Sequence, residues 1–358
     1  LYVISAEDEK TSPYYGVPYT SIGKKHANEL GFFVQDEWNV TPKLTVVPGI
    51  RIDSHSSGEE YATSVKVSDS AFPTTKFSKT TVNPRIAIKY ELTPSLVLRA
   101  NVGTGFRAPY GFSEDLHLCS GSPRVWKSSN LKGERAISYN LSADYYAKKY
   151  QFSINIFRTN LKDKIQFSPA DDEVKKFGYS YQWENVDDAY VQGVELGAKA
   201  NLFRNFNAGI NWTFNQGKFK HERADWSDPN DETVKEFPQR LQYAKDSRNI
   251  SRFPAMTGDI DLDYTHGTWT FSLTSSLQGK MYIDYNSEDD GATSKIKKTN
   301  TFMIFNCRAA KRFGTCTVYA GAKNIFSYIQ DEKHTDDAAF MYAPVYGATW
   351  YVGLSVKL

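Results

Sequence analysis

The sequence predicts an all-β fold, a transmembrane antiparallel β-barrel, and three observations support this prediction. Apolar and polar residues alternate in many segments, as they do in a strand with one apolar face. The connections between these segments alternate between short turns and long loops. Mean hydropathy is −0.52, and no run reaches the about 18 apolar residues of a membrane-spanning helix. Low hydropathy is expected when only every second residue of a strand faces lipid.

Composition narrows the class of protein. The chain has 358 residues, and 43 Lys and Arg oppose 41 Asp and Glu, which gives a net charge of +2. This balance gives no support for nucleic acid as a partner, because a surface that binds nucleic acid concentrates positive charge. Aromatic residues make up 15% of the chain, which argues against disorder, and three cysteines are too few for a disulfide scaffold or a two-site zinc module. The alternative to a membrane barrel is a soluble, aromatic-rich β protein.

Thirteen strands are expected, each from a run of alternating residues. In the third, Ile86, Ile88 and Tyr90 alternate with Ala87 and Lys89. The thirteen strands are predicted near residues 29–40, 44–53, 83–92, 95–103, 135–148, 150–162, 189–201, 205–215, 254–264, 268–280, 301–310, 315–325 and 347–358.

The connections carry the second signal. Short turns are expected at residues 41–43, 93–94, 149, 202–204, 266–267 and 311–314. Long loops are expected near residues 54–82, 104–134, 163–188, 216–253, 281–300 and 326–346. Such long loops are uncommon in a compact soluble domain, whereas outer-membrane barrels have short periplasmic turns and long extracellular loops.

The order of turns and loops sets the direction of each strand. A long outer loop precedes the last strand, so that strand runs from the outside toward the periplasm. Because antiparallel strands alternate in direction, the first of the thirteen strands runs in the same direction as the last. An antiparallel barrel closes with an even number of strands, so we expect further strands on the N-terminal side. The first residues, Leu1 to Ile4, show no signal-peptide pattern, so the chain is expected to be mature, truncated or partial.

Six motifs, in order along almost the whole chain, resemble those of TonB-dependent outer-membrane receptors. They comprise Gly31–Trp38 with Leu44–Asp53, the FRAP box in Gly105–Pro109, Asn130–Glu134, Glu184–Val186 with Val191–Leu196, Ala322–Phe326, and Tyr346–Leu354. The second box, Asn130–Glu134, lacks the prolines of the family pattern.

The resemblance implies a barrel of about 22 strands that is filled by a plug. This chain would supply about the last 13 to 14 of those strands. Residues 1–358 would then form one partial barrel domain. The N-terminal plug and TonB box of the family are expected to lie outside this sequence. The resemblance further implies location in the bacterial outer membrane among its lipids, energy coupling through the TonB–ExbB–ExbD complex, and a surface lipoprotein as a candidate partner.

The FRAP box and the second box are the first candidate site. The box residues are Phe106, Arg107, Ala108, Pro109, Asn130 and Leu131. Pro109 has no N–H and is expected to end strand pairing. Two interpretations remain open: a structural motif at the barrel rim that orders a long loop, or a substrate contact through Arg107.

His117 lies between the two boxes. In haem receptors of this family, a histidine in this interval is a candidate axial ligand, and neutral imidazole binds iron well. The alternative is a solvated or hydrogen-bonded loop histidine.

Aromatic residues in the loops are candidates for substrate stacking or for the interfacial aromatic girdle. They are Trp126, Trp183, Trp226, Tyr282, Tyr285, Phe340, Tyr342 and Tyr346, of which Trp126, Tyr282 and Tyr342 are the candidate substrate contacts. Acidic runs such as Glu288–Asp290 lack a calcium-loop pattern and are interpreted as solvated or in contact with lipopolysaccharide ions.

The cysteines leave two alternatives open. Cys307 and Cys316 flank the turn at residues 311–314, so they either form a cross-strand disulfide or act as small apolar residues of the barrel wall. Cys119 lies in a predicted outer loop.

The leading hypothesis is active import of a scarce metal chelate, such as haem, a ferric siderophore or cobalamin. The sequence contains no hydrolase, metalloprotease, nucleotide-binding or dinucleotide-binding motif, so we expect neither an enzyme, nor a resident cofactor, nor a protein-held metal. The rival functions are a passive porin and a surface adhesin.

Overall fold

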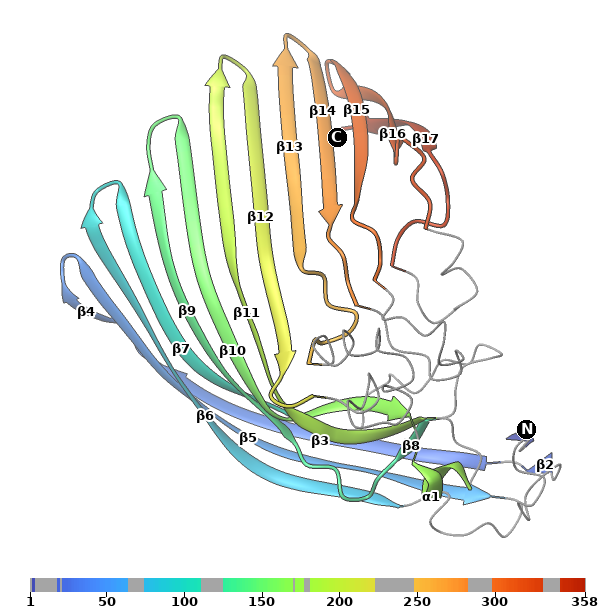
Figure 1. The fold of residues 1–358 in the computed structure, drawn as a ribbon. Coiled ribbons are helices and arrows are strands. Elements are labelled where there is room, and N and C mark those ends of the chain that lie inside the picture. The colour runs from blue at the N-terminus through green and yellow to red at the C-terminus, as the bar shows by residue number, and fades with distance from the viewer. Residues whose placement is uncertain are drawn as a thin grey trace, which may run out of the picture.

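The computed structural model describes residues 2–3, 18–19, 21–63, 74–110, 125–169, 171–176, 181–222, 248–282, 298–330 and 342–357. Its main feature is one 15-stranded sheet that curves as part of a barrel wall (Figure 1). Neighbouring strands along the sheet are β17 (Thr349–Val356), β16 (Cys316–Lys323), β15 (Phe302–Phe313), β14 (Trp269–Gln278), β13 (Met256–His266), β12 (Phe206–Phe219), β11 (Tyr181–Phe203), β10 (Tyr150–Pro169), β9 (Glu134–Tyr146), β7 (Leu96–Arg107), β6 (Thr75–Thr93), β5 (Leu44–Thr63) and β3 (Ser21–Gln35).

Every neighbouring pair along this path is antiparallel, and each strand matches one of the thirteen predicted from alternation. The first predicted strand is divided, because β4 (Trp38–Thr41) continues β3 after a break. The Asp36 side chain stabilises the conformation at this break. Its carboxylate accepts hydrogen bonds from the Glu37 amide at 2.8 Å and from the Trp38 indole at 2.6 Å.

Four small elements lie outside the thirteen strands predicted from the sequence. β1 (Tyr2–Val3) pairs with β2 (Pro18–Tyr19) in a separate two-stranded sheet. β8 (Val125–Lys127) pairs in parallel with the start of β11. The short helix α1 (Asp172–Lys175) follows β10, and the Asp171 side chain caps it by accepting from the Val174 amide.

The tight turns all lie at one end of the sheet and the long connections at the other (Figure 1). Asn205, Gly267 and Gly314 occupy left-handed conformations in three of these turns, with φ of 68°, 58° and 57°. Glycine and asparagine tolerate this conformation best, so the residues suit the turns. The predicted alternation of short and long connections is therefore confirmed.

Several predicted loops are shorter than expected because strands continue into them. β5 extends to Thr63 and β6 begins at Thr75, within the predicted loop 54–82. Likewise β10 extends to Pro169 and β11 begins at Tyr181, within the predicted loop 163–188. Beyond the membrane both faces of a strand meet water, so these segments pair through their backbones without an apolar alternation.

One face of the sheet carries an exposed apolar band. On β12, the outward positions from Phe206 through Ile210 to Phe214 are apolar, and on β9 Leu141 is 57% exposed. The band from Phe206 to Phe214 matches the about 9–11 residues with which a tilted strand crosses a bilayer. The band is therefore the lipid-facing surface of the barrel.

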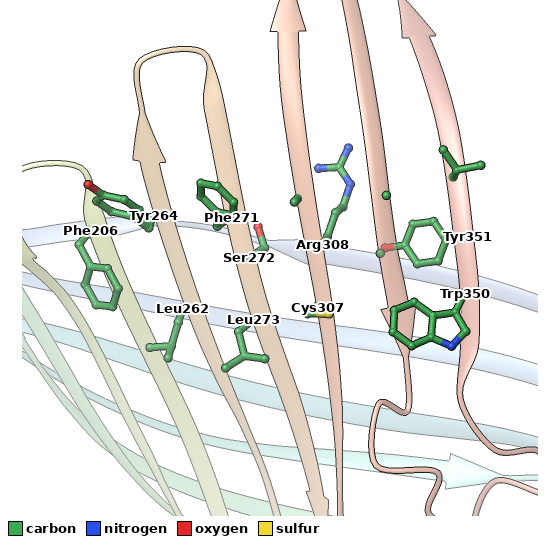
Figure 2. A pocket seen from close by; sticks show the side chains of 14 residues that line it. Phe206, Leu262, Tyr264, Phe271, Ser272, Leu273, Cys307, Arg308, Trp350 and Tyr351 are labelled. Carbon is green, nitrogen blue, oxygen red and sulfur yellow. The ribbon is translucent and has the colours of Figure 1, made fainter.

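An apolar groove of about 760 Å³ crosses this band over β12 to β17 (Figure 2). Small residues, including Cys307, Ala309 and Ala320, line it between larger side chains such as Phe271 and Trp350. Cys307 pairs in register with Ala322, and Cys316 with Phe313, so the two cysteines do not face each other and both are free. The disulfide alternative is wrong; both belong to the wall.

Aromatic rings form a belt on the outward face beside the tight turns. Ring pairs with centroid separations of 4.9 to 6.5 Å join β9 to β10, β11 to β12 and β12 to β13, and a further pair lies within β14. The belt includes Tyr145, Phe152, Phe203, Phe206, Tyr264, Trp269 and Phe271. Amphipathic rings favour the membrane–water interface, so this belt marks the inner edge of the apolar band.

The other face is polar and hydrogen-bonded between strands. Asn140 donates to Asn101 at 2.9 Å, Asn155 to Glu195 at 2.9 Å, and Asn211 to Asp259 at 2.8 Å. Arg99 forms a salt bridge with Asp144 on the same face. A polar lumen behind an apolar outer band confirms the predicted transmembrane β-barrel wall. Among the described residues there is no helix long and apolar enough to cross a membrane.

We expect Ile210→Arg to destabilise the full-length protein by about 2–4 kcal/mol in lipid vesicles, because it places a charge in the middle of the apolar band. Thr213→Arg on the lumen face of the same strand is the control and should cost far less. Denaturant unfolding followed by tryptophan fluorescence measures both. Equal losses would contradict the assignment of the two faces.

Candidate functional site

The FRAP box lies where β7 ends and the chain turns away from the wall. Arg107 is the last residue of β7 and pairs in register with Glu134 of β9. Ala108, Pro109 and Tyr110 then leave the sheet, and Pro109 and Tyr110 are buried. Because Pro109 has no N–H to pair, the strand ends here as predicted.

Tyr110 joins the FRAP box to the second box. Its hydroxyl donates to the Ser128 carbonyl at 2.6 Å and accepts from the Leu131 amide at 3.1 Å. The ring is 2% exposed and packs with Leu131, Ile165 and Trp183 in a buried cluster. One side chain therefore fixes both ends of the segment between the boxes.

The fourth motif, which contains Asn185, joins the same assembly. Asn185 accepts from the Lys132 amide at 2.8 Å and donates to the Lys132 carbonyl at 3.0 Å, as a paired strand would. The same side-chain amide donates to the Asp163 carbonyl at 2.8 Å. Three motifs that are far apart in sequence thus form one assembly, which we call the rim clasp: Phe106–Tyr110, Ser128–Gly133 and Asn185.

Gly133 allows the close approach of the two boxes. Phe106 stacks on Phe77 with centroids 5.9 Å apart, and its ring also lies against the Gly133 backbone. A Cβ at Gly133 would stand 2.2 Å from the Phe106 ring and 3.2 Å from the Arg107 carbonyl oxygen, so any other residue there would require the ring to move. The glycine of the second box therefore leaves room for the phenylalanine of the first.

A buried ion pair supports the clasp. Glu59, near the end of β5, is fully buried, and its carboxylate lies 2.8 Å from the Lys127 ammonium and 3.8 Å from that of Lys25. Lys127 is also buried. Removing either partner would leave the other charge buried, unpaired and shielded from water, so the pair is costly to break. Lys127 belongs to β8, and this contact fixes the strand that carries Trp126.

Two ionisable groups at this rim have altered pKa values. Burial raises the pKa of the Tyr110 hydroxyl to about 12; the Leu131 amide opposes this and the charge of Glu59 adds to it. The pKa of the Asp187 carboxyl lies below its ordinary value. Burial alone would raise this pKa, but hydrogen bonds from His221 and Asp188 stabilise the carboxylate and outweigh burial. Asp187 accepts from the His221 amide at 2.7 Å and so anchors the segment that leaves β12.

A second cluster lies at the base of the later loops. Asn324, in the fifth motif, donates to the carbonyls of Tyr328 at 2.7 Å and Tyr346 at 3.1 Å. The buried Gln330 accepts from the amides of Tyr342 at 2.9 Å and Ala343 at 3.2 Å. Two amide side chains therefore hold the two ends of the segment between β16 and β17 together.

The candidate aromatic residues of these loops lie in this second cluster. Tyr342 packs against Met281 and lines a cavity of about 400 Å³ with Phe302 and Gln278. The Lys298 ammonium stands 4.5 Å from the centre of the Tyr282 ring. The Tyr342 ring therefore lines a cavity, and separately the Tyr282 ring lies beside a cation; aromatic faces and cations of this kind can contact an anionic ligand.

The structure thus separates the predicted site residues into two groups. The clasp contains Phe106, Arg107, Ala108, Pro109, Asn130 and Leu131, with Trp126 beside it on β8, while Tyr282 and Tyr342 belong to the second cluster. His117, Cys119, Trp226, Tyr285 and Phe340 lie outside the described residues. Sequence reasoning missed Tyr110, Glu59 and Gln330, because nothing local in the sequence indicates their distant partners.

Comparisons with known proteins agree with this architecture. The model of the family "TonB dependent receptor-like, beta-barrel" matches residues 4–325. The chain is similar to the vitamin B12 transporter BtuB of Photobacterium profundum, with 26% identity over 72% of this chain and 36% of that protein. It is also similar to a ferric enterobactin receptor of Pseudomonas aeruginosa, with 25% identity over 53% of this chain and 24% of the relative.

Solved structures with the same fold include the copper transporter OprC and the ferric citrate transporter FecA. Each has a TM-score of 0.66 at 18% identity. The alignments cover 92% and 94% of this chain but 48% and 46% of those chains. The chain therefore spans about half the length of these structures, and about a third or less of the two relatives above.

We expect Tyr110→Phe to lower the free energy of unfolding of the clasp by about 1–3 kcal/mol, because it leaves the buried Leu131 amide without an acceptor. Hydrogen exchange at the Leu131 amide at neutral pH measures this local loss. Tyr139→Phe, which changes an outward-facing ring on β9, is the matched control. Unchanged protection of Leu131 in Tyr110→Phe would show that the clasp does not depend on this hydroxyl.

The same hydroxyl predicts a loss of stability at alkaline pH. The folded pKa of about 12 exceeds the about 10 of an exposed tyrosine, so the folded state favours the protonated form. The stabilisation is complete below about pH 10 and is lost as the pH rises through the folded pKa. In denaturant unfolding, the free energy of unfolding of wild type should therefore exceed that of Tyr110→Phe by less and less as the pH rises through this window. A difference between the two free energies that does not change with pH would contradict the assignment.

Proposed function

This chain belongs to the TonB-dependent receptor-like β-barrel family, and from that premise we propose that it is the outer-membrane wall of a receptor that captures and imports a metal chelate. The family is one of receptors and transporters of the Gram-negative outer membrane, and its members are not enzymes. The apolar band and aromatic belt fit that location.

We further propose that the wall is completed by additional strands. The described sheet ends in β3 on one side and β17 on the other, and no described strand pairs with either outer edge. Backbone groups in lipid must be hydrogen-bonded, so a spanning sheet must close. Residues 1–358 would then form one part of a larger plugged barrel.

The substrate class rests on the relatives. The curated relatives are named for vitamin B12 and ferric enterobactin, and the structural neighbours for copper and ferric citrate. Most of these ligands are a metal ion held by an organic ligand. By this analogy, the proposed substrate of this chain is a ferric siderophore, cobalamin or haem.

The observation that carries the proposal is the rim clasp. Three family motifs converge on one buried assembly at the base of the loop between β7 and β9. A fixed base lowers the entropy that a loop loses when it closes on a ligand. Trp126 and Arg107 lie at this base and Tyr282 and Tyr342 at the second, where stacking and charge would contact the chelate.

Import would require energy, because a scarce substrate is carried against its gradient. In the family this energy comes through TonB, which acts on a plug N-terminal to the barrel, with ExbB and ExbD as further proposed partners. A porin would pass its substrate without TonB, and an adhesin would bind without passing anything. TonB dependence of uptake therefore distinguishes the three functions.

Binding is tested by tryptophan fluorescence of the full-length protein titrated with cyanocobalamin, a ferric catecholate, ferric citrate and haem. We expect saturable quenching by one of them, with metal-free chelator binding more weakly. Tyr282→Ala and Tyr342→Ala should each weaken that binding about twofold to tenfold, the worth of an aromatic contact. Tyr264→Ala in the lipid-facing belt is the matched control.

Uptake is then measured with the labelled ligand in cells with and without TonB. Uptake that persists without TonB would indicate a porin, and binding without uptake an adhesin. For haem, a Soret shift that is lost in His117→Ala would identify the ligand; a shift that His117→Ala leaves unaltered would exclude that histidine as the axial ligand.

A further inference from the structure

Cations lie on the outward face directly beyond the apolar band, at the loop end of the wall. On β10 the outward positions are apolar up to Ile156, and the next ones are Arg158, Asn160 and Lys162. On β9 the same change occurs between Ile137 and Arg135. The edge of the lipid-facing surface is therefore also the start of a basic region.

The strand register brings these cations together. Lys162 pairs with Arg135 across β10 and β9, and Arg158 pairs with Gln192 across β10 and β11. Positions opposite one another in an antiparallel pair point to the same face. Arg135, Arg158 and Lys162 therefore share the outward face, which is the face that carries the apolar band.

These side chains line a cavity of about 610 Å³. Its cationic residues are Arg135, Arg158, Lys162, Lys220 and Arg248, against the single carboxylate of Asp188. That carboxylate already accepts a hydrogen bond from the Asp163 amide at 3.1 Å. The rest of the lining mixes polar residues such as Asn83 and Thr104 with apolar ones, among them Ile137 and Phe106. Ile137 belongs to the apolar band, so the cavity adjoins the lipid-facing surface.

The basic cluster carries uncompensated charge. Within the described residues none of the five cations forms a salt bridge with a carboxylate. Arg158 is held in position instead: it donates to Asn160 at 2.9 Å and Gln192 at 2.7 Å and lies 4.3 Å from the centre of the Tyr190 ring. Like charges that line one cavity repel one another, so the cluster is suited to bind an anion between them.

We propose that this cavity binds the phosphate groups of an anionic glycolipid of the outer leaflet, with its acyl chains lying on the apolar band below. The position selects a lipid over a free anion, because the cavity opens at the level where lipid head groups begin. At the opposite edge of the band, Lys311 lies 4.8 Å from the Trp269 ring and 5.0 Å from the Phe313 ring, beside the tight turns. That edge faces the other leaflet.

The test uses full-length protein in detergent and native mass spectrometry, with bisphosphorylated lipid A as the probe. Monophosphorylated and fully dephosphorylated lipid A test the phosphate requirement, and inorganic phosphate tests the free anion. We expect one retained bisphosphorylated lipid, weaker retention with one phosphate, none without phosphate, and no displacement by millimolar inorganic phosphate.

The combined variant Arg135→Gln, Arg158→Gln, Lys162→Gln and Lys220→Gln should weaken lipid binding at least about tenfold, since each cation near an anionic surface contributes measurably. Lys311→Gln, an outward cation at the opposite edge, is the matched control and should leave binding unchanged. Heat-modified mobility on a gel checks folding; if the combined variant does not fold, single substitutions at Arg158 and Lys162 should each weaken binding by about twofold or more.

Equal retention by wild type and the folded variants, equal binding of dephosphorylated lipid, or displacement by inorganic phosphate would each overturn the proposal. Chelate binding is measured on the same variants and should be unchanged, because these residues lie outside the loop clusters. Loss of lipid binding with intact chelate binding therefore separates this site from the proposed receptor function.

Discussion

A strand that crosses a lipid bilayer must have every backbone amide and carbonyl paired with a neighbouring strand, because hydrocarbon offers no other partner. This requirement shapes the whole molecule. It explains the continuous antiparallel pairing from β3 to β17 and the tight turns that join strands at one end. It also explains why the large apolar residues lie outside, where Trp350 and Val352 are 77% and 78% exposed, instead of forming a central core.

With the wall fixed by its backbone, side chains are left to organise the ends. At the turn end, stacked aromatic rings form a belt and small left-handed turns reverse the chain. At the loop end, single polar side chains connect segments that are distant in sequence: Tyr110, Asn185, Asn324 and Gln330 each bond to two backbone groups or more. The family motifs are therefore where the loops are anchored, which assigns them a structural role whatever the loops bind.

The sequence was informative wherever one face of a strand had to be apolar. Alternation such as Ile86, Ile88 and Tyr90 gave the number, order and direction of the strands. It failed where both faces meet water: Ser54, Ser56 and Glu60 continue β5 without any period-two pattern. It also failed where contacts depend on tertiary structure, since Glu59 and Lys127 are 68 positions apart. Six motifs identified the family, but only the folded structure shows that three of them touch.

The unpaired borders of the described sheet have a practical consequence. β3 (Ser21–Gln35) and β17 (Thr349–Val356) are the two ends of the described sheet, and each pairs with a neighbouring strand along one edge only. The backbone N–H and C=O groups along the other edge have no described strand as a partner. Such borders recruit other strands. A preparation of residues 1–358 alone would therefore be expected to oligomerise edge to edge through these two borders.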